Sequence, residues 1–201
     1  MKKRYTLIIA AIVLFSVLSL AVLINNTSSS NISNPINENN VITRIEMSAS
    51  WASAYPDIRS LTNASDFIGL VSIEDVVAVD VISSGFEEES ENGTLYLTTY
   101  SARVISAVYP DLDLIKIVLT GRNDGESIIE IADDPLMKEG ETCFIFARLN
   151  DRGSYTILSG PNGRFSYNET NDTITSLPNS PIELFEMSLS EIESEIRLYL
   201  N

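Results

Sequence analysis

The short motif with the clearest potential for chemistry is GPNGRF, a glycine-bounded turn whose arginine is Arg164. Backbone N–H groups of a glycine turn, together with a guanidinium, form a suitable site for an anionic group. The motif therefore predicts ligand binding by Asn162, Gly163 and Arg164. The alternative is structural: the glycines adopt left-handed backbone angles in a tight turn, and Arg164 pairs with an acid such as Asp66 or Glu141.

The chain has no histidine and one cysteine, and these two facts exclude several kinds of site. Without histidine there is no Ser-His-Asp or Cys-His catalysis and no histidine-ligated zinc. Cys143 lies in the apolar stretch TCFIFA, which is typical of a buried strand, so we predict a core thiol and not a nucleophile. A single cysteine also excludes an internal disulfide. Carboxylate chemistry, Ser-Lys dyads and oxygen-ligated metals remain.

The remaining candidates do not form recognisable constellations. The acidic run Glu87–Glu91 lacks the Asp-x-Asp-x-Asp-Gly order of a calcium loop and is predicted to be a solvated hairpin loop. Beyond the N-terminus the lysines are Lys116 and Lys138, and no serine motif accompanies either of them. Lys116 is predicted to face water from a strand. The sequence thus predicts no catalytic residue, no metal site and no cofactor.

The N-terminus predicts where the protein works. A basic head, Met1–Arg4, precedes an uncharged apolar run, Tyr5–Ile24. About 20 residues at roughly 1.5 Å each cover the ~30 Å hydrocarbon core of a bilayer. Positive charge before the run keeps the N-terminus in the cytoplasm. We therefore predict an uncleaved, single-pass membrane anchor in residues 5–24. Secretion after cleavage near Ser19–Ala21 is the alternative.

The residues after the anchor divide into two parts. Residues 25–49 are rich in Asn, Ser and Thr and are predicted to be a disordered linker, while residues 1–24 are the signal anchor and residues 50–201 form one extracytoplasmic domain. Because three of the 13 basic residues precede Tyr5, the rest of the chain carries 28 acids against 10 bases. This charge argues against nucleic acid as a partner and favours a protein, a peptide or a cell-wall polymer.

The domain reads as mainly β. Long β-branched stretches are followed by shorter ones, and a capping box at Ser188 and Glu191 begins a C-terminal helix. The predicted strands lie within residues 66–83, 94–108, 115–119, 127–131, 142–147, 155–158 and 164–167. A short helical turn at residues 60–66 precedes them, and Asp124-Gly125 is a hairpin-turn signal before residues 127–131. This order predicts a small OB-like barrel, with a β-sandwich as the alternative.

Several motifs in this order resemble a family of exported, membrane-anchored domains found mainly in Gram-positive bacteria. That family has an OB-like barrel similar to the tissue inhibitors of metalloproteinases, but without their cysteines. The resemblance covers about residues 58–177, and at Asp133-Asp134 the chain departs from the family's Gly-Gly. It implies a fold and a location and leaves the activity open. The matching segments are Ser60-Leu61, Ala64–Val71, Leu119–Gly121, Gly125–Ile131, Pro135–Phe146 and Gly160–Phe165.

We therefore expect a non-enzymatic binding or interaction module at the outer face of a membrane. Two alternatives belong to other classes: a carboxylate-dependent hydrolase of envelope material, and an inhibitor of extracellular proteases. A deep pocket holding two acids of divergent pKa would favour the hydrolase. Absence of the N-terminal cysteine with which such inhibitors reach the metal of their target counts against the inhibitor.

Overall fold

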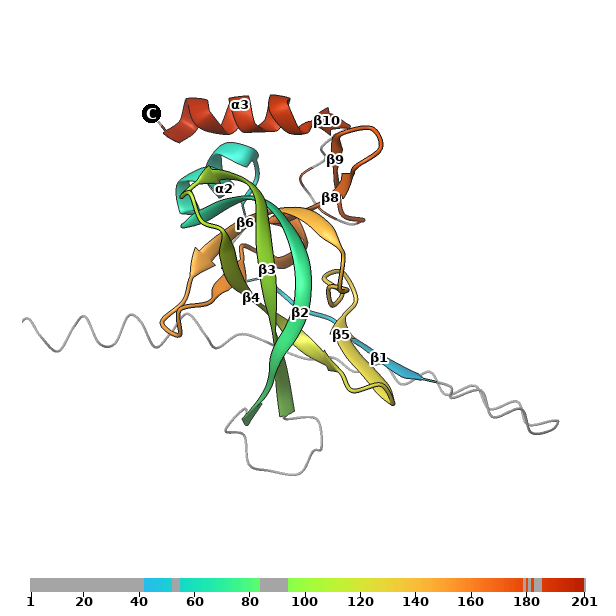
Figure 1. Cartoon of the computed structure of the whole chain (residues 1–201). Coiled ribbons are helices and arrows are strands. Elements are labelled where there is room, and N and C mark those ends of the chain that lie inside the picture. Colours follow the sequence, from blue (N-terminus) through green and yellow to red (C-terminus); the bar gives the residue numbers. More distant parts are fainter. Residues whose placement is uncertain are drawn as a thin grey trace, which may run out of the picture.

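The computed structural model describes residues 42–51, 55–83, 94–178, 180, 182 and 186–200 (Figure 1). The predicted anchor and the acidic run Glu87–Glu91 lie outside these residues. Within the described part, no helix has both the length and the apolar character needed to cross a membrane.

The described residues form ten strands in one sheet, two α-helices and one 3₁₀ helix. The prediction of a mainly β domain with a short N-terminal and a longer C-terminal helix is confirmed. The elements are β1 (Thr43–Met47), α2 (Ile58–Ala64), β2 (Phe67–Ser83), β3 (Thr94–Tyr109), β4 (Leu114–Asn123), β5 (Ser127–Ile131), β6 (Thr142–Leu149), β7 (Tyr155–Ile157), η2 (Gly160–Asn162), β8 (Arg164–Asn168), β9 (Thr173–Ser176), β10 (Met187–Ser188) and α3 (Leu189–Leu200).

The strands pair in the order β1-β5-β4-β3-β2-β6-β8-β9-β10, and β7 lies beside both β4 and β6. β7 is parallel to β4 and antiparallel to β6. Because β6 also pairs with β2, the pairings run from β2 through β3, β4, β7 and β6 and return to β2. This ring of five strands surrounds part of the core.

β1 lies inside the range that was predicted to be a linker. Its residues pair in parallel with β5, from Thr43 opposite Ser127 to Met47 opposite Ile131. The strand is short and mostly exposed, and it follows a long Asn-rich stretch, so the alternation of Arg44 to Met47 was not recognised as a strand. The ordered part of the chain therefore begins before residue 50, and the linker prediction is corrected for residues 43–47.

Two cores lie on opposite faces of β6, which is apolar on both faces. Phe144 and Phe146 point into the first core, which we call the helix-side core. Cys143 and Ile145 point into the second, which we call the inner core. This double burial explains why TCFIFA is a continuous apolar run rather than an alternating one. It also confirms the core position of Cys143, which is 1% exposed.

Helices α2 and α3 close the helix-side core and lie together at one end of the sheet (Figure 1). The predicted capping box of α3 is present: the Glu191 amide donates to Ser188 Oγ, and the Ser188 amide donates to Glu191 Oε2. Burial of Ile192 and Ile196 then holds the apolar face of α3 against α2 and β3. Helix α3 therefore packs on the other helix as well as on the sheet.

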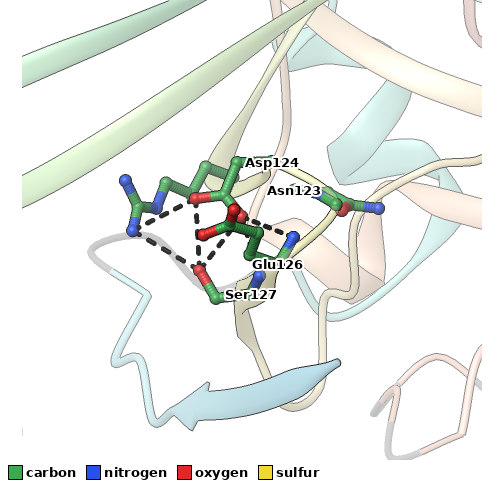
Figure 2. A network of polar contacts seen from close by, with 6 residues as sticks. Asn123, Asp124, Glu126 and Ser127 are labelled. Carbon is green, nitrogen blue, oxygen red and sulfur yellow. Dashed lines mark hydrogen bonds and ion pairs between the residues drawn. The ribbon is translucent and has the colours of Figure 1, made fainter. Parts of the chain in front are cut away.

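The β4–β5 hairpin turn is held by the carboxylate of Asp124 (Figure 2). Its Oδ1 accepts hydrogen bonds from the amides of Glu126 and Ser127 at 3.0 and 2.7 Å. These bonds lower the pKa of Asp124, and the bond from the Ser127 amide lowers it most. Arg122 Nη2 lies 3.3 Å from Asp124 Oδ2. The Asp124-Gly125 turn predicted from the sequence is thus confirmed, and this network has a structural role.

Two glycines of this region have positive φ angles and different surroundings. A Cβ at Gly121 (φ +129°) would stand 2.4 Å from the Ile129 carbonyl oxygen, whereas a Cβ at Gly125 (φ +84°) would meet nothing within 4 Å. We predict that Gly125→Ala costs about 1 kcal/mol of unfolding free energy through backbone strain alone. Gly121→Ala adds a backbone clash and should cost at least about 3 kcal/mol.

Urea denaturation of the full chain measures both changes. Equal losses in the two variants would contradict this packing of β4 against β5.

Candidate functional site

The arginine of the GPNGRF motif points into the protein. Arg164 begins β8 and lies opposite Ile145 of β6, so its side chain enters the inner core. It is 2% exposed. Its Nη2 donates to the Pro135 carbonyl oxygen at 2.9 Å and lies 3.3 Å from Asp134 Oδ1. The guanidinium therefore joins β8 to the loop between β5 and β6.

The partner of Arg164 differs from the two acids considered from the sequence. Asp66 accepts from the Leu149 amide, and Glu141 accepts from the Lys138 amide. Asp134 is the acid beside Arg164, and an isolated β-bridge joins it to Ile131 at the end of β5. Asp134 also stands where the chain departs from the Gly-Gly of the resembling family, and that departure was the one signal in the sequence that pointed to it.

The Asp134–Arg164 pair is buried but incompletely hydrogen-bonded. Among the described residues, Arg164 Nε and Nη1 and Asp134 Oδ1 find no hydrogen-bond partner. Burial raises the pKa of Asp134 to about 6, the Arg164 guanidinium opposes this shift, and the neighbouring Asp133 carboxylate adds to it. The pair therefore positions the 133–137 loop at a cost in desolvation.

The other two residues of the predicted ligand site are also enclosed. Asn162 is 6% exposed, and its Nδ2 donates to Ser159 Oγ at 3.4 Å. A Cβ at Gly163 would lie 2.5 Å from the Leu158 carbonyl oxygen. The turn thus brings Asn162, Gly163 and Arg164 together, but inside the protein. This geometry favours the structural interpretation, and ligand binding by these three residues stays a prediction.

Trp51 covers the turn from outside. A Cβ at Gly160 would overlap the Trp51 indole, 2.2 Å from its nearest ring atom. The indole N–H of Trp51 donates to Asp133 Oδ2 at 3.5 Å. The residue after β1 therefore ties the turn and the 133–137 loop together, and the glycine is required for this close approach.

A pocket of about 320 Å³ opens beside the inner core. Its wall includes Glu130, whose carboxylate accepts from the Leu136 amide at 3.0 Å and also from Arg44. Tyr100 contributes a phenol whose pKa is raised to about 12, chiefly by burial. The other lining residues are Val76, Thr98, Asn123, Ile128, Met137, Lys138 and Glu139.

The described carboxyl and thiol with raised pKa values lie away from the pockets. Asp134 is the carboxyl with a raised pKa among the described residues, and it lines neither pocket described here. Burial raises the pKa of the Cys143 thiol to about 12, so the reactive thiolate is suppressed at neutral pH. Lys116 is exposed, as predicted. The described residues contain no group of three acidic or sulfur side chains placed to hold a metal.

The surface feature that sequence reasoning missed is on the outer half of β2. Four valines there are 44 to 64% exposed, and we call them the valine edge: Val76, Val77, Val79 and Val81. Beside it lies a second pocket of about 520 Å³, whose lining includes Val77, Asp80 and Thr156. The sequence predicted this strand but not its exposed outer half. The signal that was missed is its length, because 17 residues at about 3.3 Å each extend roughly 55 Å.

Comparison of the chain with protein-family models, with curated proteins and with solved structures finds no match in any of the three. The resemblance to exported barrel domains therefore stays a prediction from the sequence motifs.

The buried pair generates a pH-dependent stability. The carboxyl of Asp134 has a pKa near 3.8 when unfolded and about 6 when folded, so the folded protein binds more protons between these values. The contribution of Asp134 to stability should therefore decline as pH rises from about 4 to about 6 and then stay low. We predict that Asp134→Asn removes this decline, as measured by urea denaturation of the full chain from pH 4 to pH 7.

The exposed Asp151→Asn variant is the matched control and should keep the wild-type slope. If wild type and Asp134→Asn show the same dependence on pH, the account of Asp134 is wrong.

Proposed function

We propose that this chain is a non-enzymatic binding module held at the outer face of a cell membrane by residues 5–24. The observation that carries the proposal is the valine edge. Monomeric proteins rarely leave several large β-branched side chains side by side in water, because exposed apolar surface of this kind favours association. The valine edge is therefore a docking surface for a partner.

The fold that presents this surface is an OB-like barrel. The ring of pairings through β2, β3, β4, β7 and β6 supports it, since five strands that return to the first are the strand number of this fold. The connection of all ten strands in one sheet disfavours the β-sandwich, which needs two separate sheets. Beyond Ser72, where its pairing with β6 ends, β2 continues beside β3 and carries the valine edge.

The location outside the cytoplasm rests on the sequence. An uncharged apolar run follows a basic head, and a polar segment separates it from β1. The strongly acidic domain suits a solvated position above anionic headgroups. A cleaved signal peptide would place the same domain in the same compartment without its tether.

The carboxylate hydrolase is less well supported. It would need two acids with different pKa values facing one pocket. Asp134, with its raised pKa, lies against Arg164 and away from both pockets, and Glu130 is occupied by Arg44 and the Leu136 amide. No described side chain is thus poised in a pocket as a general acid.

A cysteine placed on the valine edge tests location and binding together. Cys143, the native cysteine, is buried with a raised pKa, so a new surface thiol would dominate labelling. Val81→Cys and the matched control Leu198→Cys replace side chains that are 64% and 75% exposed. In intact source cells, a membrane-impermeant maleimide that carries a photoreactive diazirine should label both variants and, on illumination, crosslink a partner through Val81→Cys only.

Two results would contradict the proposal. Labelling only after the cells are broken would overturn the location outside the membrane. Labelling of both variants without a crosslink specific to Val81→Cys would overturn the binding role of the valine edge.

A further inference from the structure

The outer edge of β2 is covered along only part of its length. β6 pairs with β2 from Phe67 to Ser72. The loop before β6 adds two bonds at Ile73, whose amide donates to Glu141 and whose carbonyl oxygen accepts from Gly140. From Val76 to Ser83 the described structure gives β2 one neighbouring strand, β3. No described strand pairs with its other edge there, although the Val76 amide donates to Asp75 Oδ1.

The exposed valines lie on both faces of this part of the strand. Val79 and Val81 share a face with their cross-strand neighbours Thr98 and Tyr96. Val77 lines the larger pocket on the opposite face, together with Ala78 and Asp80. A partner lying flat against one face would leave either Val77 or the other three valines in water. A strand added along the edge would contact both faces and would also pair with the backbone of that edge.

The usual protection of an exposed edge is nearly absent here. Natural edge strands carry lysine, proline or closely spaced charges that prevent pairing with another chain. Residues 76–83 read VVAVDVIS, with no lysine and no proline, and Asp80 is the charge within them. The bulge between Val76 and Ala78 bends the start of this segment and leaves Ala78 to Ser83 in regular register with β3.

The charge around the edge selects the kind of strand that would bind. Glu74, Asp75 and Asp80 lie along it, and the ten residues that follow Ser83 contain four glutamates and no base. The basic groups nearby in the structure, Arg103 and Arg152, each pair with one of these exposed acids. A second copy of this acidic chain would bring like charges together, whereas a basic segment would be attracted.

We propose that the edge of β2 from Val76 to Ser83 binds an extended, basic and β-branched segment of a partner protein by strand addition. This inference rests on the proposed binding function and adds the mode of binding and the chemistry of the partner. Main-chain hydrogen bonds supply the attachment, the valines pack against apolar side chains of the added strand, and the negative net charge of the chain attracts its lysines or arginines.

The test uses the full chain in detergent and a synthetic probe peptide of about eight alternating valine and lysine residues. We expect saturable binding that weakens with salt, and slower amide hydrogen exchange in residues 76–83 of the bound protein. A peptide with glutamate in place of lysine, and one interrupted by proline, should bind at least about tenfold more weakly.

Substitutions on the edge and elsewhere on the surface show which of the two binds the lysine probe. Val79→Lys combined with Val81→Lys should reduce binding of the lysine probe at least about tenfold. The control variant Leu149→Lys changes a side chain of β6 that is 49% exposed, and it should bind the lysine probe as tightly as wild type does. Unchanged exchange in residues 67–73 shows that each variant is folded.

Three results would overturn strand addition. The first is no saturable binding of the lysine probe. The second is binding without protection of residues 76–83. The third is a dimer of the free chain protected at these residues, which would make a second copy the occupant. A crosslink specific to Val81→Cys in cells would still support the binding module in the first two cases, so failure of this mode is distinguishable from failure of the function.

Discussion

Burial of β6 on both of its faces is the constraint on which the rest of the structure depends. Phe144 and Phe146 need the two helices to exclude water on one side, while Cys143 and Ile145 need the ring of strands on the other. With no disulfide available, apolar packing must supply the stability that small exported domains often take from crosslinks. Helices, ring and C-terminal strands are therefore all arranged around this one strand.

Arg164 is the exception within that apolar arrangement. The GPNGRF turn directs its side chain into the inner core. There Nη2 donates to the Pro135 carbonyl oxygen and forms an ion pair with Asp134. Removing either partner would leave a buried charge without compensation, so the pair fixes the conformation of the 133–137 loop more than it adds to stability. The same loop supplies Leu136 and Met137 to the wall of the smaller pocket. The turn thus acts from inside the protein on the wall of this pocket.

The parts of the fold that could be predicted from the sequence are those determined by local chemistry. The capping box at Ser188 and Glu191, the Asp124-Gly125 turn and the apolar strand around Cys143 each depend on neighbours a few residues away. The partner of Arg164 could not be predicted, because many acids were available and tertiary contacts alone decide which one is buried. β1 was missed for the opposite reason: its residues are exposed, and only pairing with β5 makes them a strand.

The valine edge shows a third limit of prediction from the sequence. Residues 67–73 and 76–83 have similar compositions, yet β6 and its preceding loop cover only the first group. Composition indicates a strand in both cases, but it cannot indicate the residue at which β6 and its preceding loop stop covering that strand. The same apolar chemistry stabilises the fold in the first half of β2 and is exposed in the second.

The central claim is therefore that β2 changes along its length from a core strand to an open edge. Amide hydrogen exchange of the free full chain measures this most directly, because both halves are compared within one strand. The account predicts that amides of residues 67–73 exchange on average at least about 100-fold more slowly than those of residues 76–83. Equal protection along the whole strand would contradict it.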